Sequence, residues 1–153
     1  MSEPKKITKD EILAAMPQQP PFLFIDNAEI DGDEMTGSYT VREDEVFFEG
    51  HFKGNPVFPG TLMLETLGQL GVLYLLKSDN PAIGGKVDAS KIFFISADGC
   101  RCQRICRPNE VFDFKVKVEK LRYPVAVFSG KLLVGGQKAA MAESLTLTFD
   151  YLK

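Results

Sequence analysis

The chain has 153 residues, of which 44% are hydrophobic and 25% are charged. This length favours a single domain over residues 1–153, large enough to fold without a metal or a disulfide. There are 18 basic and 21 acidic residues, so the net charge is −3 and the composition argues against a nucleic-acid binder. The three cysteines all lie within Cys100–Cys106. They form neither a disulfide framework nor a zinc signature, and we interpret them as packing residues on one side of a strand, in a protein from a reducing compartment.

The N-terminal residues are polar, which predicts a loose tail over residues 1–7 and no secretory signal peptide. The longest apolar stretch, Leu62–Leu76, has only 15 residues and contains Glu65 and Gln69. It is too short for a membrane span and predicts a buried helix. We therefore expect a cytoplasmic protein with no membrane span.

In chain order, Thr8 and Glu11 have the spacing of a capping box and predict a helix over residues 9–15, which ends before Pro17. Two strands are expected next, Phe22–Ile30 and Met35–Val41, with a turn between them. An irregular segment then covers residues 43–60, with three glycines and two prolines. A loop of this length inside a compact domain usually has a function.

Thr61–Lys77 is predicted as the one long helix, and it is apolar nearly all round, so it must be enclosed by other elements. The rest of the chain has the alternating pattern of strands, and Gly135–Gly136 marks a hairpin. The predicted strands are Lys86–Ala97, Arg101–Cys106, Val111–Leu121, Val125–Val134 and Lys138–Tyr151. The sequence thus predicts an α+β domain in which a mostly antiparallel sheet wraps one buried helix.

His51 is the only histidine and lies in the long loop, between Gly50 and Phe52. It is either a turn residue with a structural hydrogen bond or a general base, because imidazole titrates near neutral pH. Glu65 lies in the first turns of the helix, among leucines. It is either a cap stabilised by the helix dipole or an acid whose pKa is raised by desolvation.

Gln69 follows Glu65 by four residues and therefore lies on the same face of the helix, where its amide can hold the carboxylate. Gly60 opens the helix. Its backbone N–H is suited to polarise a carbonyl oxygen, although a plain helix start would have the same sequence. Arg101, Arg104 and Arg107 form a local basic patch, which is either an ordinary solvated strand or a surface for an acidic partner.

The segment GHFKGNPVFPGTLMLETLGQLG, residues 50–71, resembles the 3-hydroxyacyl-acyl-carrier-protein dehydratase family. The family motif is His-Phe-x-Gly-x-Pro-Val-x-Pro-Gly, followed by an acid and a glutamine on the helix, and every position is filled. The resemblance continues through PPFLFID at 20–26 and ADGCRCQRICRPNE at 97–110. Lys53 and Asn109 depart from the residues usual in the family, but neither change removes a catalytic group.

The resemblance implies a hotdog fold and a homodimer, and it leaves open whether the dimers assemble further into a trimer of dimers. It also implies that His51 removes the α-proton of the acyl thioester, while Glu65 of the partner chain protonates the departing β-hydroxyl. Gly60 would bind the thioester carbonyl, and Gln69 would orient Glu65. No metal or redox cofactor is implied.

The resemblance further implies an apolar substrate tunnel, with Phe52, Phe58 and Leu62 as walls. The acidic acyl carrier protein would dock on Arg101, Arg104 and Arg107. The expected reaction is dehydration of (3R)-3-hydroxyacyl-acyl-carrier-protein to the trans-2-enoyl form, in fatty-acid or related lipid or polyene biosynthesis. Two alternatives stay open, namely an acyl thioesterase on the same fold and a non-catalytic acyl-binding protein.

Overall fold

The structure of the protein is a computed structural model that describes residues 3–153. In this range the strands form one antiparallel sheet in the order β1-β2-β3-β6-β7-β8-β4, with the short β5 also paired to β8. The strands are β1 (Lys5–Ile7), β2 (Asn27–Asp31), β3 (Glu34–Thr40), β4 (Phe93–Asp98), β5 (Arg101–Cys102), β6 (Val111–Arg122), β7 (Val125–Val134) and β8 (Gln137–Thr148). The helices are α1 (Lys9–Ala15) and α2 (Gly60–Lys77), with short 3-10 turns η1 (Val46–Glu49) and η2 (Ala89–Lys91).

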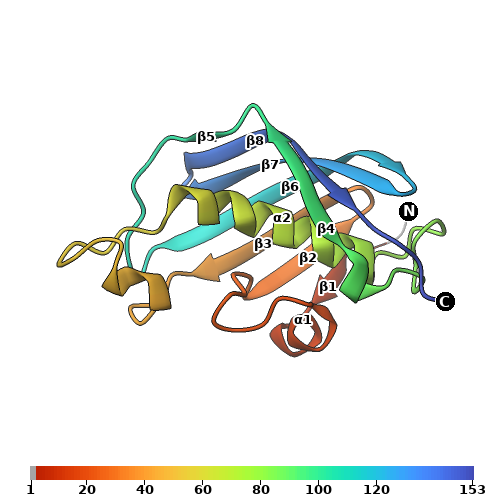
Figure 1. Cartoon of the computed structure of the whole chain (residues 1–153), viewed down its shortest axis with the longest axis horizontal. Coiled ribbons are helices and arrows are strands. Elements are labelled where there is room, and N and C mark those ends of the chain that lie inside the picture. The colour runs from red at the N-terminus through yellow and green to blue at the C-terminus, as the bar shows by residue number, and fades with distance from the viewer. Residues whose placement is uncertain (1–2) are drawn as a thin grey trace.

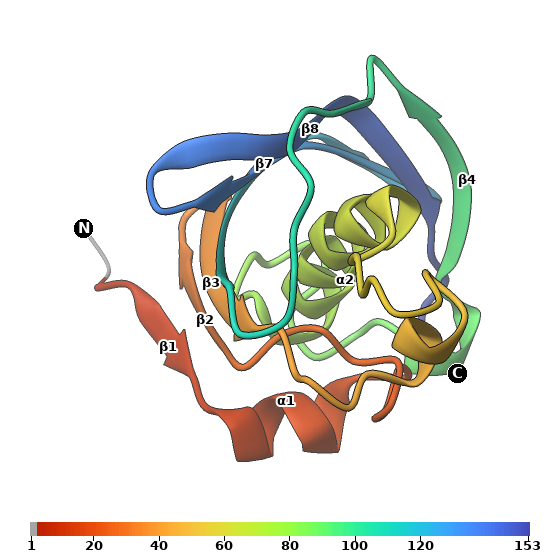
Figure 2. The same cartoon turned by 90° about the vertical axis from the view of Figure 1, so that its left-hand side faces the viewer.

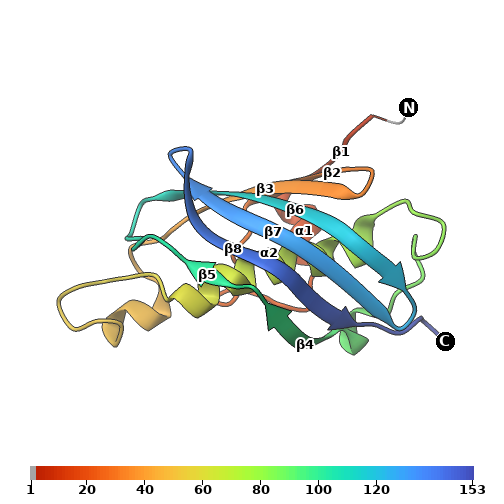
Figure 3. The same cartoon turned by 90° about the horizontal axis from the view of Figure 1, so that it is seen from above.

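The sheet curves around α2, as Figure 1 and the view turned by 90° in Figure 2 both show. Seen from above, the long strands β6, β7 and β8 run across the helix (Figure 3). Leu67, Leu70 and Leu73 of α2 are fully buried against the inner face of the sheet. The predictions of an enclosed helix and of the α+β hotdog architecture are confirmed. Within residues 3–153, none of the helices combines the length and apolar character that crossing a lipid bilayer requires.

Helix α1 begins and ends where the sequence predicts. Thr8 accepts a hydrogen bond from the Glu11 backbone N–H, and the Glu11 side chain accepts one from the Thr8 backbone, which completes the capping box. Met16, the residue before Pro17, is already extended because a proline disfavours the helical conformation of the residue before it.

Four predicted elements differ in the structure. Lys5–Ile7, expected in a loose tail, pairs with β2, and residues 1–2 of that tail lie outside the described part. The predicted strand Phe22–Ile30 is reduced to β2 because the Phe24 N–H bonds to a side chain of α2 instead of a neighbouring strand. The predicted strand Lys86–Ala97 is reduced to β4, which starts at Phe93, because the turn η2 precedes it, capped by a hydrogen bond from the Ser90 N–H to Asp88.

The predicted strand Arg101–Cys106 is also wrong beyond Cys102, where β5 ends. The Gln103 N–H still donates to the Ala139 carbonyl of β8. The chain then leaves the sheet, and the Cys106 carbonyl accepts a hydrogen bond from the Phe58 N–H, next to the start of α2. The three cysteines therefore do not share one face: Cys100 is half-buried, Cys102 is exposed and Cys106 is buried.

The two edges of the sheet differ in character. At one edge β1 is three residues long and carries Lys5 and Lys6, features that discourage pairing with another chain. At the other edge β4 exposes Phe93, Phe94 and Ile95, whose exposed fractions lie between 53% and 63%. A strand edge with three neighbouring exposed apolar side chains is a surface for pairing with a further strand.

Candidate active site

His51 lies at the start of the tight loop that connects η1 to α2. Its Nδ1 is 2.8 Å from the Val57 carbonyl oxygen, and the Val57 N–H donates to the His51 carbonyl over 3.0 Å. A ring nitrogen facing a carbonyl must carry the hydrogen, so in the neutral imidazole Nε2 is unprotonated. His51 is half-buried, and its ring stacks on Phe52 with 3.8 Å between the centroids. This arrangement leaves Nε2 able to accept a proton.

Glu65 projects from the second turn of α2 and is only partly exposed. Burial raises the pKa of its carboxyl group, while the hydrogen bond from Gln69 works in the opposite direction. Gln69 Nε2 lies 3.0 Å from Glu65 Oε2, the contact that the helical spacing predicts. A carboxyl group of raised pKa that also has a fixed orientation is suited to donate a proton near neutral pH.

Gln69 is completely buried and is itself held by backbone groups of a neighbouring segment. Its Oε1 accepts a hydrogen bond of 2.9 Å from the Phe24 N–H, and its Nε2 donates to the Phe22 carbonyl over 3.0 Å. These two contacts fix which way the amide faces, so the amide N–H points at Glu65. Sequence reasoning missed the two backbone partners because only a side-chain pattern, and no backbone path, can be read from PPFLFID.

Gly60 is the first residue of α2 and follows Pro59. In the described chain neither the Gly60 nor the Thr61 amide donates to a protein acceptor, as expected for the first turn of a helix. A side chain at position 60 would meet Cys102 Sγ at 2.9 Å. The glycine is therefore needed for the close packing of β5 on the helix start. A cavity of about 300 Å³ adjoins this point, bounded by Phe58, Met63 and Cys102 among others.

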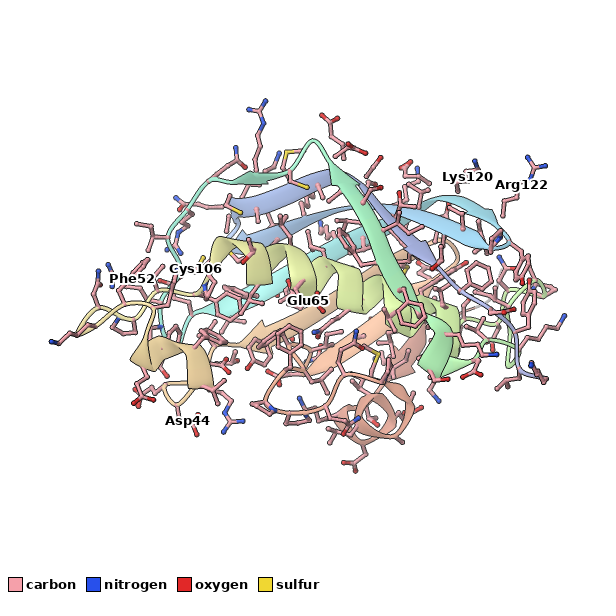
Figure 4. All side chains as sticks on the ribbon, in the orientation of Figure 1. Asp44, Phe52, Glu65, Cys106, Lys120 and Arg122 are labelled. Atoms are coloured by element: carbon pink, nitrogen blue, oxygen red, sulfur yellow. The ribbon has the colours of Figure 1, made fainter. Side chains whose placement is uncertain are left out.

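The structure keeps His51 and Glu65 of one chain apart. The His51 ring bonds to Val57 and the Glu65 carboxylate to Gln69, and no hydrogen bond or ion pair in residues 3–153 joins the two side chains. Figure 4 shows the loop that carries Phe52 extending beyond the N-terminal end of α2, whereas Glu65 lies further along the helix.

The predicted tunnel residues differ in how far they are buried. Phe58 is buried in an aromatic cluster, with ring centroids 5.6 Å from Phe24 and 5.0 Å from Phe112. Phe52 is 50% exposed on the projecting loop, and Leu62 is half-buried.

The predicted basic patch is partly neutralised in the structure. Arg104 forms an ion pair with Glu110, and Arg107 donates to Asn55 Oδ1 over 2.6 Å, which ties it to the His51 loop. Arg101 is exposed on β5, and among the described residues no carboxylate pairs with it. The described residues also bring no group of three or more histidine, cysteine, aspartate or glutamate side chains close enough to hold a metal ion.

Comparison with known proteins places this chain in a family. The model of the FabA-like domain matches residues 16–143. The chain is 40% identical over 142 residues to the 3-hydroxyacyl-acyl-carrier-protein dehydratase FabZ of Caulobacter vibrioides, covering 92% of this chain and 87% of that protein. It is 34% identical to FabZ of Chloroflexus aggregans, covering 94% and 96% of the two chains. The chain belongs to the FabA-like family.

Solved structures share the fold at low sequence identity. The dehydratase heterocomplex ApeI:P of Xenorhabdus doucetiae matches with a TM-score of 0.70 and 15% identity, over 94% of this chain and 91% of that chain. A hypothetical thioesterase of Streptococcus pneumoniae, solved with coenzyme A, matches with a TM-score of 0.58 and 12% identity, over 83% and 91%. These likenesses support the hotdog architecture and leave the reaction to be argued from the site.

The raised pKa of Glu65 predicts a pH-dependent difference in stability between the wild type and Glu65→Gln. A carboxyl group whose pKa is higher in the folded than in the unfolded chain favours folding fully at pH values below its unfolded pKa, about 4.5. This contribution is lost as the pH rises through the folded pKa. We expect the wild type to lose stability relative to Glu65→Gln over that interval, as measured by urea unfolding between pH 4 and pH 8. A stability difference that stays constant with pH would contradict the burial of this carboxyl group.

Proposed function

We propose that this protein is a hydro-lyase that dehydrates (3R)-3-hydroxyacyl-acyl-carrier-protein to trans-2-enoyl-acyl-carrier-protein. The observation that carries the proposal is that a chain of this family contains both a candidate base, His51, and a candidate acid, Glu65. In the neutral His51 ring the bond from Nδ1 to Val57 leaves Nε2 as the nitrogen that can accept a proton, and Glu65 is a largely buried carboxyl group held by Gln69. The FabZ relatives, at 34–40% identity over most of the chain, have names that state this activity.

In the proposed mechanism His51 Nε2 removes a proton from the α-carbon of the acyl thioester. Negative charge develops on the thioester oxygen, where the Gly60 N–H stabilises it by a hydrogen bond and by the positive end of the α2 dipole. The electron pair then forms the Cα–Cβ double bond as the β-hydroxyl leaves. Glu65 gives its proton to that hydroxyl, so the products are water and the enoyl thioester. The histidine has gained one proton and the glutamate has lost one, so a return transfer restores the enzyme.

The mechanism needs an acid that is protonated and a base that is not, at the same pH. Burial raises the pKa of Glu65 and so favours its protonated form. The hydrogen bond from His51 Nδ1 to the Val57 carbonyl selects the ring form with a free Nε2. The environments of the two groups thus suit their proposed roles.

We propose that the working unit is a homodimer, in which each site takes His51 from one chain and Glu65 from the other. Two features support it. One chain separates the two side chains, and β4 carries Phe93, Phe94 and Ile95 on a sheet edge with no further strand in the described chain. Pairing of this edge with a second copy would cover the apolar side chains. The apolar substrate tunnel, with Phe52, Phe58 and Leu62 near it, would then form between the subunits.

We further propose that residues 3–153 act as one hotdog domain in the cytoplasm, in fatty-acid or related lipid biosynthesis. The sheet combines strands from both ends of the chain, with β1 and β8 in one hydrogen-bonded network. The three cysteines are free thiols, as is usual for proteins of a reducing compartment.

Replacement of either proposed proton-transfer group tests the function directly. We expect His51→Ala and Glu65→Gln each to lower hydration of a trans-2-enoyl thioester, the reverse reaction, by at least about 100-fold. The loss of ultraviolet absorbance of the conjugated thioester measures the rate. Arg122→Ala, in the hairpin at the far end of the molecule (Figure 4), is the control and should keep the wild-type rate. Full activity in both site variants, or release of free thiol in place of hydration, would contradict the proposal.

The geometry of the arginines refines the proposed docking of the acyl carrier protein. Arg104 is paired with Glu110, so we assign the main attraction to Arg101, with Arg107 beside the His51 loop. Arg101→Glu should raise KM for a carrier-linked substrate roughly tenfold and leave KM for the coenzyme A-linked substrate unchanged. Equal KM changes for both substrates, or none, would remove Arg101 from the docking surface.

A further inference from the structure

A buried tyrosine–carboxylate pair lies at the base of the loop that carries His51. Tyr39 of β3 and Glu45 are 3% and 7% exposed, and the Tyr39 hydroxyl donates to Glu45 Oε2 over 2.5 Å. Burial, together with the neighbouring carboxylate, raises the pKa of Tyr39, so its hydroxyl keeps the hydrogen that it donates. Placing a carboxylate in the interior is costly unless it is hydrogen-bonded. The cost of burying Glu45 therefore indicates that the Tyr39–Glu45 pair has a structural or functional role.

Glu45 ties together the segment that leads from β3 to His51. The same Oε2 accepts a second hydrogen bond, of 3.3 Å, from the Arg42 N–H. The Glu45 carbonyl accepts one of 3.1 Å from the Phe48 N–H, which starts η1. Gly50 N–H then donates to the Phe47 carbonyl over 3.2 Å, and His51 follows directly. Each link of this path from Tyr39 to His51 is a hydrogen bond or a short run of chain.

The Tyr39 ring also contacts the segment that orients Glu65. Its centroid lies 5.7 Å from that of Phe24, and Phe24 lies 6.1 Å from Phe47 of η1. The Phe24 backbone N–H is the donor that fixes Gln69. One aromatic cluster thus connects the residues that hold the His51 loop with Phe24, whose backbone holds Gln69 and through it Glu65.

We propose that the Tyr39–Glu45 hydrogen bond positions His51 for proton transfer, by fixing the base of the loop that carries it. This inference rests on the proposed function, and it makes Tyr39 and Glu45 positioning residues that do not touch the substrate. Without the bond the loop keeps its aromatic contacts but loses its anchor to β3. Small displacements of a catalytic group lower the rate of the chemical step more than they lower substrate binding.

Removal of one oxygen atom tests the proposal. Tyr39→Phe should lower kcat for enoyl-thioester hydration roughly tenfold and change KM less than about twofold. Glu45→Ala should lower kcat further, whereas Glu45→Gln should recover part of the loss, because its amide oxygen still accepts from Tyr39. Tyr123→Phe is the matched control: Tyr123 also donates to a carboxylate, Asp150, over 2.8 Å, but on the surface. It should leave both constants unchanged.

The single histidine provides a second readout by NMR. In the untagged protein all imidazole signals come from His51, and Tyr39→Phe should shift or double them while Tyr123→Phe leaves them in place. Unchanged His51 signals in Tyr39→Phe would overturn the proposal, and so would shifted signals with an unchanged kcat. If the signals shift but the wild type itself does not hydrate enoyl thioesters, the proposed function fails while the positioning of His51 by the pair stands.

Discussion

The structure depends on enclosing one polar row, Glu65 and Gln69, along a helix that is mostly apolar. Such a row is destabilising unless its members satisfy one another and find partners elsewhere. Gln69 meets this constraint by bonding to the backbone of Phe22 and Phe24 as well as to Glu65. The segment before β2 consequently leaves the sheet and runs beside the helix, and the helix can carry a carboxyl group whose pKa is raised by burial.

The position of His51 follows from a different constraint, the hydrogen bonding of a loop rather than of a helix. The ring is tied to the Val57 carbonyl, and the loop projects beyond the body of the sheet (Figure 1). A base on a projecting loop and an acid on an enclosed helix do not meet within one chain. The apolar edge formed by β4 gives the chain a surface on which a second copy can bring the two groups together.

Much of the fold could be predicted from local sequence patterns. The capping box at Thr8 and the all-round apolar helix depend on neighbours in the sequence, so the sequence alone predicts them. The path of Phe22–Asp26 depends on Gln69, more than forty residues away, and the early end of β5 depends on contacts between Cys106 and Phe58. The motif likewise indicates the proposed catalytic residues and the contact of Gln69 with Glu65, but not the backbone groups that hold Gln69 or the pair that holds the His51 loop. Glu45 stands in a run of charged residues, so its burial can be recognised only when its partner, the Tyr39 hydroxyl, is seen.

The central claim is that each active site is shared between two subunits, and subunit mixing tests it most directly. His51→Ala and Glu65→Gln proteins, each inactive alone, are unfolded together in equal amounts and refolded. If the sites are shared, half of the dimers are mixed and each contains one intact site, so activity should return to about a quarter of the wild-type value. If both groups of a site belong to the same chain, every site in the mixture lacks one of them and the mixture stays inactive. A refolded mixture without activity would therefore contradict the account.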